Sequence, residues 1–146
     1  MKATSSEALN QPLHRSLAEF RHQLRMFTLA SESAATRAGV HPQQHQLLLA
    51  IAGAPAGVSP SIAYAAERLG LKHNSAVELV DRCEDEGLLQ RTTDRDDGRR
   101  VCLRVTRRGH KLLDGLSHVH LRELYSQGPH LIEALRSVLQ NEIQSK

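Results

Sequence analysis

Basic side chains cluster in one short stretch of the sequence, where they could bind phosphate. Between Arg91 and Arg108 there are seven arginines and three aspartates, a local charge of +4. A basic block of this kind is an electrostatic footprint for nucleic acid. A solvated surface loop is the alternative interpretation. Just before this block, residues 78–86 carry five acids and one arginine, a local charge of −4, so the net charge of +3 is a sum over regions of opposite sign.

Histidine and cysteine residues are the other candidates for chemistry. His41 and His45 are four residues apart, and His118 follows in a later helical stretch. Zinc binds histidines at such spacings, but no cysteine or acidic ligand set accompanies them, so we expect no metal centre and interpret them as solvated.

The two cysteines form no CxxC pair, which excludes a disulfide framework. Cys83 is expected to be a small buried core residue, and Cys102 to be partly exposed on a strand.

Composition and missing motifs exclude several classes of protein. No stretch approaches the roughly 18 uninterrupted apolar residues of a membrane span, and we expect no secretory signal, because residues 1–12 have no apolar core. Aromatic residues are 3% of the chain, too few for the base-stacking platforms of single-strand RNA binders. The sequence has no GxSxG, HExxH, GxGxxG or Walker-type loop, so we do not expect an enzyme.

Periodic apolar residues predict a mostly helical chain. The seam Leu17, Phe20, Leu24 and Phe27 has the three-four spacing of an amphipathic helix, which we place at about 13–38. A second helix is expected from Pro42, a residue that suits the first helical turn, with an apolar face at Leu47, Leu48 and Ile51.

Two short helices and a hairpin should follow. Ser61 is expected to cap a helix that ends at Gly70, where the chain must turn with a positive φ. Asn74 or Ser75 is expected to cap the next helix, which has a core face at Ala76, Leu79, Val80 and Cys83 and ends at Gly87.

The pattern then alternates in the manner of strands. Residues 88–92 and 101–105 are predicted to pair as a hairpin, because the segment between them is polar and ends in Asp-Gly. Thr106 should cap a long helix, which Gly128-Pro129 is expected to break before a last helix. Together the elements predict a helix-turn-helix followed by a basic hairpin.

Four segments carry a resemblance to a known family. They are Leu69-Gly70-Leu71, Val80-Asp81-Arg82-Cys83-Glu84-Asp85-Glu86-Gly87-Leu88-Leu89, Asp94-Arg95-Asp96-Asp97-Gly98-Arg99-Arg100 and Val105-Thr106-Arg107-Arg108-Gly109. In this order they resemble the winged-helix core of MarR-type transcriptional regulators over about residues 41–113. The most specific part is the Asp-x-Arg of the hairpin followed by Thr-x-x-Gly.

The resemblance implies a fold and a function. The fold would be mainly α, with a winged helix-turn-helix at 41–106 and a helical dimerisation region at 13–40 and 107–146. The protein would be a cytoplasmic homodimer that represses transcription at palindromic double-stranded DNA. Its recognition helix, about 74–86, would enter the major groove, and its wing, 91–105, the minor groove. A small phenolic effector would release the DNA, and neither a bound cofactor nor a membrane is expected.

We expect the DNA contacts to come from the recognition helix, the helix before it and the wing. The predicted DNA-binding residues are Ser61, His73, Asn74, Ser75, Val77, Glu78, Arg82, Arg95 and Arg99. Glu78 departs from the family pattern, and its carboxylate would repel phosphate or accept a hydrogen bond from cytosine N4. Arg82 matches a backbone-contacting position, with an ion pair to Glu78 or Glu86 as the alternative. Asp97 is expected to orient Arg99 or to cap the loop.

The terminal helices are predicted to join two copies of the chain. The predicted dimerisation residues are Leu17, Phe20, Leu24, Leu131, Leu135, Val138 and Leu139. Packing within one subunit is the alternative for this seam, and we favour the homodimer because two-fold dimers are the commonest soluble oligomers.

Two other functions stay open. A zinc-responsive branch of the family uses histidines in the second and fifth helices, which His45 and His118 match, with His41 as a further candidate. A helical interaction module without DNA binding is the other alternative, and Glu78 favours it. The peroxide-sensing branches carry their reactive cysteine in the first helix, where this chain has none, so we do not expect a redox switch.

Overall fold

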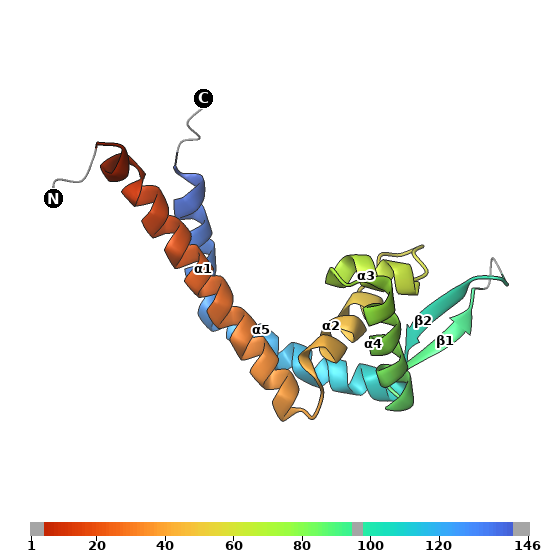
Figure 1. The fold of residues 1–146 in the computed structure, drawn as a ribbon. Helices are drawn as coiled ribbons and strands as arrows, with labels where there is room; N and C mark the ends of the chain where they lie inside the picture. Colours follow the sequence, from red (N-terminus) through yellow and green to blue (C-terminus); the bar gives the residue numbers. More distant parts are fainter. Residues whose placement is uncertain (1–4, 95–97, 142–146) are drawn as a thin grey trace. The chain divides into compact units, whose positions relative to one another are not determined.

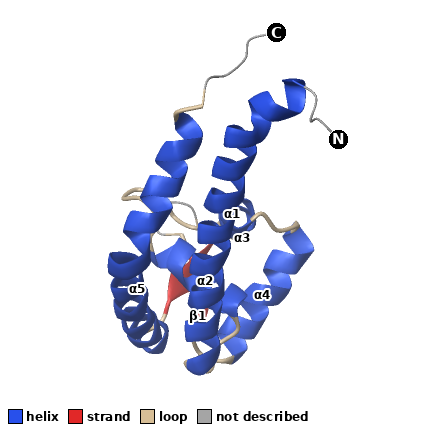
Figure 2. Cartoon of the chain, turned by 90° about the vertical axis from the view of Figure 1, so that its left-hand side faces the viewer, coloured by secondary structure: helices blue, strands red, loops and turns tan. Residues whose placement is uncertain are grey.

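The structure is a computed structural model that describes residues 5–94 and 98–141. The elements, in chain order, are α1 (Ser5–Arg37), α2 (Pro42–Ala52), α3 (Ile62–Leu69), α4 (His73–Asp85), β1 (Leu89–Thr93), β2 (Val101–Val105) and α5 (Arg107–Leu139) (Figure 1). Helices make up most of the described chain (Figure 2), and β1 and β2 pair as an antiparallel hairpin (Figure 1). The predicted class, mainly α with a minor β component, is confirmed.

The chain divides into two compact units. One runs from Glu32 to His118, and the other combines the chain up to Ser31 with the chain from Val119 onward. Both α1 and α5 therefore contribute residues to each unit. The assignment of all of 13–40 and 107–146 to a dimerisation region stays a prediction.

The Glu32–His118 unit has its core around α2, which contacts α3, α4 and β2. The largest fully buried side chains are Leu47, Leu48, Leu89, His45, Val80 and Cys83. The apolar face predicted for α2 and the core face predicted for α4 are both buried, which confirms these two predictions.

Local hydrogen bonds explain where α2 and α3 begin. Pro42 occupies the first turn of α2, as expected, and His41 Nδ1 accepts from the Gln43 N–H at 3.2 Å. Ser61 Oγ accepts from the Tyr64 N–H at 3.1 Å, so Ser61 caps α3 as predicted. These caps satisfy amide groups that have no partner inside a helix.

The start of α4 differs from the prediction. We expected Asn74 or Ser75 as the cap, but α4 begins at His73, and the cap position, Lys72, makes no side-chain capping hydrogen bond. The reason is the brevity of the turn: Gly70, with φ of +66°, ends α3 in the left-handed conformation, and the Leu71 N–H already bonds back to the Ala66 carbonyl at 2.9 Å. Only Leu71 and Lys72 then separate this glycine from α4.

The hairpin begins one residue later than expected. Leu89 pairs with Val105 and Thr93 with Val101, so β1 covers 89–93 instead of 88–92. Cys102, which we expected to be partly exposed, is buried, with only 8% of its surface exposed. The chain before α3 runs beside β2, where the Leu103 N–H donates to the Pro60 carbonyl at 2.7 Å, and α2 also contacts this strand, so β2 is packed within its unit.

Both terminal helices are longer than predicted. α1 begins at Ser5 and contains Pro12, and α5 continues through Gly128-Pro129 without the expected break. A proline removes one helical hydrogen bond, but side-by-side packing offsets that loss. In the unit that contains both chain ends, Ser16 Oγ and Ser137 Oγ hydrogen-bond at 3.0 Å, so α1 and α5 lie side by side beyond Pro129 (Figure 1).

Within residues 5–94 and 98–141, no helix combines the length and apolar character that crossing a membrane requires.

Candidate nucleic-acid interface

Helix α4 has a buried face and an opposite polar face. Ala76, Leu79, Val80 and Cys83 pack into the core. The predicted contact residues that are exposed on α4 are His73, Asn74, Ser75, Glu78 and Arg82. Val77 is half-buried at the border between the two faces. The helical period therefore brings five of the six residues predicted on this helix to solvent.

The C-terminal end of α4 is closed by a left-handed glycine. Gly87 has φ of +73°, the Gly87 N–H donates to the Glu84 carbonyl at 3.0 Å, and the Leu88 N–H donates to the Cys83 carbonyl at 2.9 Å. This pair of bonds ends a helix and redirects the chain into the next element. It sets the angle at which β1 leaves α4.

The Thr-x-x-Gly sequence after β2 locks the hairpin to this same turn. Thr106 Oγ1 donates to the Gly87 carbonyl at 2.6 Å and accepts from the Gly109 N–H at 3.1 Å, which confirms Thr106 as the cap of α5. The Thr106 N–H donates to the Leu88 carbonyl at 3.1 Å. Gly109 is buried, and a Cβ there would collide with the Leu88 carbonyl oxygen and with Val105. The motif is thus a close backbone junction between α4, the hairpin and α5.

Arg91 bridges two acids of α4, an arrangement the sequence reasoning missed. Its Nη2 lies 2.7 Å from Asp81 Oδ1, and its Nη1 lies 2.7 Å from Glu84 Oε1. The Arg91 N–H also donates to Glu84 Oε2 at 3.0 Å. The hydrogen bond to Asp81 is the main reason that the pKa of Arg91 is raised above its ordinary value. The signal was present in the sequence, because a −4 segment directly precedes a +4 segment.

Arg82 does not form the ion pair that was its alternative role. Among the described residues, neither Glu78 nor Glu86 lies within ion-pair distance of Arg82, which is exposed. Its guanidinium group therefore remains accessible on the polar face of α4.

The wing is described in part. The Asp94 N–H donates to the Arg100 carbonyl at 2.8 Å and continues the hairpin beyond the paired strands. Arg99 is exposed. Arg95 was predicted to contact DNA, and Asp97 was predicted to orient Arg99 or to cap the loop. Both residues lie outside the described residues.

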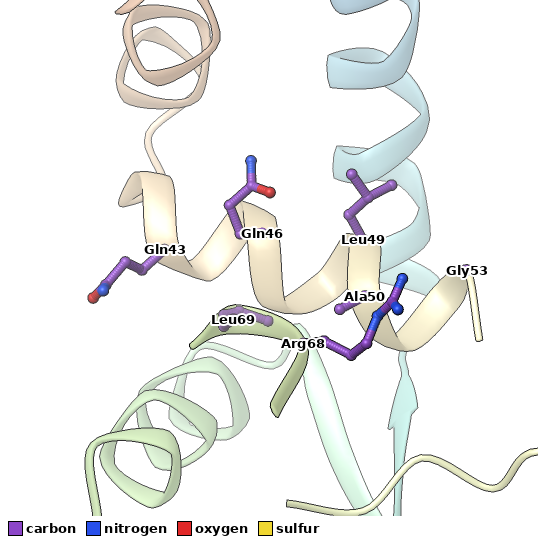
Figure 3. A pocket seen from close by; sticks show the side chains of 7 residues that line it. All are labelled: Gln43, Gln46, Leu49, Ala50, Gly53, Arg68 and Leu69. Atoms are coloured by element: carbon purple, nitrogen blue, oxygen red, sulfur yellow. The ribbon is translucent and has the colours of Figure 1, made fainter. Parts of the chain in front are cut away.

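The helices α2 and α3 enclose an open pocket of about 530 Å³ (Figure 3). Its lining residues are Gln43, Gln46, Leu49 and Ala50 of α2, Gly53 directly after that helix, and Arg68 and Leu69 of α3. Arg68 brings a guanidinium group beside Ala50 (Figure 3). The lining thus combines one cation, two amides and an apolar surface, directly before the Gly70 turn.

The predicted dimerisation residues include several large apolar side chains in contact with solvent. Leu17, Leu24, Leu135 and Leu139 are exposed, and Leu139 reaches 74%. The remaining three are half-buried: Phe20, Leu131 and Val138. The unit that holds the chain ends therefore leaves much of its apolar seam exposed.

Comparison with known proteins decides the family. The model of the MarR family matches residues 38–100, which run from before α2 to the start of β2. A relative from Thauera aromatica, whose name assigns it to regulation of the hcr operon, is 30% identical over 119 residues, or 82% of this chain and 70% of the relative. The chain belongs to the MarR family of transcriptional regulators.

Solved structures show the MarR fold over most of the chain. A MarR family transcription regulator, SP03579, matches with a TM-score of 0.73 at 20% identity, covering 93% of this chain and 91% of that one. CouR from Rhodococcus jostii RHA1, bound to p-coumaroyl-CoA, matches with a TM-score of 0.60 at 22% identity, covering 82% of this chain and 88% of that one. MarR regulators are DNA-binding proteins and not enzymes, so α4 and the wing are the elements to consider for DNA.

The histidines proposed as metal ligands in this MarR-family chain lie in different settings. His45 is buried on α2, so the interpretation of this histidine as solvated was wrong. His41 caps that helix, and His118 Nδ1 lies 2.7 Å from the Asp114 carbonyl oxygen on α5. Within residues 5–94 and 98–141, no three side chains of His, Cys, Asp or Glu come together in a group that could hold a metal ion.

Cys83 behaves as the core residue that the sequence predicted for this MarR-family chain. Its side chain has no exposed surface, and burial is the main reason that its pKa is raised from 9.0 to about 12. Reactive cysteines need a lowered pKa, because the thiolate is the nucleophile. Cys83 is therefore a neutral packing residue at physiological pH.

Proposed function

We propose that this MarR-family regulator binds a palindromic operator as a homodimer and represses transcription there. The observation that carries the proposal is the exposed polar face of α4, which leads through the Gly87 turn into a basic hairpin while its opposite face packs into the core. In this proposal α4 enters the major groove and the wing enters the minor groove. Two copies related by a two-fold axis would meet half-sites about 34–36 Å apart.

The shape and chemistry of α4 support a place in the major groove. A helix with its side chains is about 10–12 Å across, and the groove is about 12 Å wide. Asn74 and Ser75 offer donors and acceptors for base edges in the first turn. No side chain caps the first turn of α4, which leaves its amide groups available to a phosphate oxygen.

The wing supports the proposal through its charge. Arg99, Arg100 and Arg104 are exposed in the described part of the hairpin. Arginine is favoured in narrow minor grooves, where the negative potential is strongest. The basic hairpin would therefore contact the groove next to the one that α4 reads.

The homodimer is supported by the exposed leucines of α1 and α5. Large apolar side chains that remain in water favour association, because their burial contributes about 25 cal/mol per Å² of apolar surface. A second copy of this chain offers the same surface, which suits a two-fold interface.

A small-molecule effector is supported by the pocket between α2 and α3. Its guanidinium group, amides and apolar surface suit an aromatic ligand that carries an anionic group. CouR, a structural neighbour, has been solved with p-coumaroyl-CoA. Because the pocket ends at the Gly70 turn, an occupant could shift α4 and release the DNA.

The proposal is tested by selecting duplexes from a random pool and measuring the affinity of the best site against salt concentration. We expect a palindromic site, a steep loss of affinity with salt, and weaker binding when aromatic acids or their thioesters are added. Arg82→Ala should reduce the slope of log K against log salt by about one. If no duplex binds better than random sequence, the operator proposal is wrong.

A further inference from the structure

The ion-pair cluster of Arg91, Asp81 and Glu84 lies where the recognition helix meets the wing. α4 lies next to β1 (Figure 1). Arg91 reaches back from the strand to both carboxylates of the helix. One guanidinium fork thus joins the two elements that are proposed to enter neighbouring grooves. Arg91 bridges the two acids, with one terminal nitrogen on each carboxylate, and both contacts are charge-assisted hydrogen bonds of 2.7 Å.

Asp81 lies on the same stripe of α4 as the residues proposed to read DNA. It is three residues after Glu78 and seven after Asn74, so the helical period aligns the three on one face. The Asp81 side chain remains 54% exposed. An unpaired carboxylate at this place would face the phosphates of the DNA and repel them.

Glu84 accepts two hydrogen bonds from Arg91, whereas Asp81 accepts one. Both of its carboxylate oxygens accept from residue 91, one from the side chain at 2.7 Å and one from the backbone N–H at 3.0 Å. Because the backbone of β1 takes part, the contact also fixes where the strand starts relative to α4. Arg91 itself is only 28% exposed, so its charge is directed at the helix and not at solvent.

We propose that Arg91 is a positioning residue for DNA binding: it neutralises Asp81 and Glu84 on the recognition helix, so that α4 can approach phosphate. The inference rests on the proposed function, in which α4 enters the major groove. It separates Arg91 from the wing arginines Arg99, Arg100 and Arg104, which are proposed to contact DNA directly. Arg91 acts through the two carboxylates and needs no contact with the nucleic acid.

A double-mutant cycle tests this role, with the selected operator and the full chain. Arg91→Met is compared with the pair Asp81→Asn and Glu84→Gln, and with all three changes together. We expect Arg91→Met to weaken operator binding by about tenfold or more, because it leaves two carboxylates unpaired near phosphate. Neutralising the carboxylates should restore most of that loss, yet change the affinity less than about twofold when Arg91 is present.

The cycle distinguishes masking from a direct phosphate contact. If Arg91 touches phosphate, the effects of the three changes add, and the proposal is overturned. Arg104→Met is the matched control, because Arg104 is an exposed wing arginine outside the ion pairs of the described residues. The carboxylate changes should not rescue Arg104→Met.

Folding and the proposed function are controlled separately. Circular dichroism and thermal unfolding are recorded for every variant, and Arg91→Lys, which keeps the charge but cannot bridge both acids, is run in parallel. We expect Arg91→Lys to show an intermediate loss with the same rescue, and a loss without rescue contradicts the proposal. Operator binding by the unmodified chain and the effect of Arg82→Ala test the proposed function independently of Arg91.

Discussion

At the scale of single residues, one glycine and one threonine hold the wing to the recognition helix. The Thr106 hydroxyl donates a hydrogen bond to the Gly87 carbonyl and caps α5. Gly109 has no side chain and therefore allows the Leu88 carbonyl to approach the backbone of α5. The short Thr-x-x-Gly motif therefore has a steric cause as well as a capping cause. Neither residue needs to contact DNA to matter for DNA binding.

Gly109→Ala should destabilise the protein by about 1–3 kcal/mol, because the added methyl group overpacks a junction made of backbone. Urea unfolding measures this difference. Gly115→Ala is the matched control on the same helix, because nothing lies within 4 Å of a Cβ there. That control should be neutral or more stable by about 0.5–1 kcal/mol. Equal effects at both glycines would contradict the close-junction interpretation.

The buried thiol of Cys83 should make stability depend on alkaline pH. The unfolded chain ionises near 9.0, whereas burial holds the folded pKa at about 12. The unfolded state therefore binds fewer protons in this range, so the contribution of Cys83 is complete below pH 9 and is lost as pH rises from 9 towards 12. The free energy of unfolding, measured with urea at several alkaline pH values, should fall more steeply than in Cys83→Ala. Identical slopes in the two proteins would refute the assignment.

At the scale of elements, the hairpin is the part in which basic side chains are most concentrated. Its strands pair in the predicted manner with a shift of one residue, and its arginines project from a short sheet joined to α4. In the proposed function, binding to DNA would be shared between a helix that reads bases and a hairpin that adds electrostatic attraction.

Arg99→Ala should weaken operator binding by about 1–3 kcal/mol while the oligomeric state stays unchanged. Fluorescence anisotropy with a labelled operator gives the affinity, and sedimentation gives the oligomer. Arg136→Ala serves as the control, because Arg136 lies on α5 and pairs with Glu133 at 2.9 Å. Unaltered operator binding by Arg99→Ala would remove the wing from the mechanism.

The elements that sequence reasoning placed well are those with local signals. Ser61, Gly70 and Thr106 each act through hydrogen bonds or a φ angle within a few residues, and the apolar faces of α2 and α4 follow the helical period. Two predictions of helix bounds were wrong, because α1 starts before Pro12 and α5 continues through Pro129. The expected exposure of Cys102 was also wrong, since burial depends on contacts between residues far apart in the sequence.

At the scale of the whole molecule, the exposed leucines of the terminal helices raise the question of a second copy. Leu135 and Leu139 remain in water although their sequence spacing suits a helical interface. An apolar seam of this kind, with too little partner surface in its own chain, favours a homodimer.

Leu135→Glu combined with Leu139→Glu should shift the protein towards a monomer and weaken operator binding, because charges replace an apolar contact surface. Analytical ultracentrifugation measures the shift. Val58→Glu is the matched control, because Val58 is 43% exposed in the α2–α3 connection and Leu135 is 42% exposed. If the doubly substituted chain sediments like the unmodified one, these leucines do not hold a dimer.

The sequence by itself determined the order of the elements as far as the start of α5, the helix-turn-helix with its basic hairpin and the likeness to MarR regulators. These depend on periodicity, caps and turn residues, which act over a few positions. The tertiary structure alone decided that Arg91 pairs with Asp81 and Glu84, that Arg82 stays accessible, and that Cys102 is buried. The Arg91 ion pairs depend on the angle between α4 and β1, and the burial of Cys102 depends on packing between distant segments. No local sequence pattern encodes that angle or that packing.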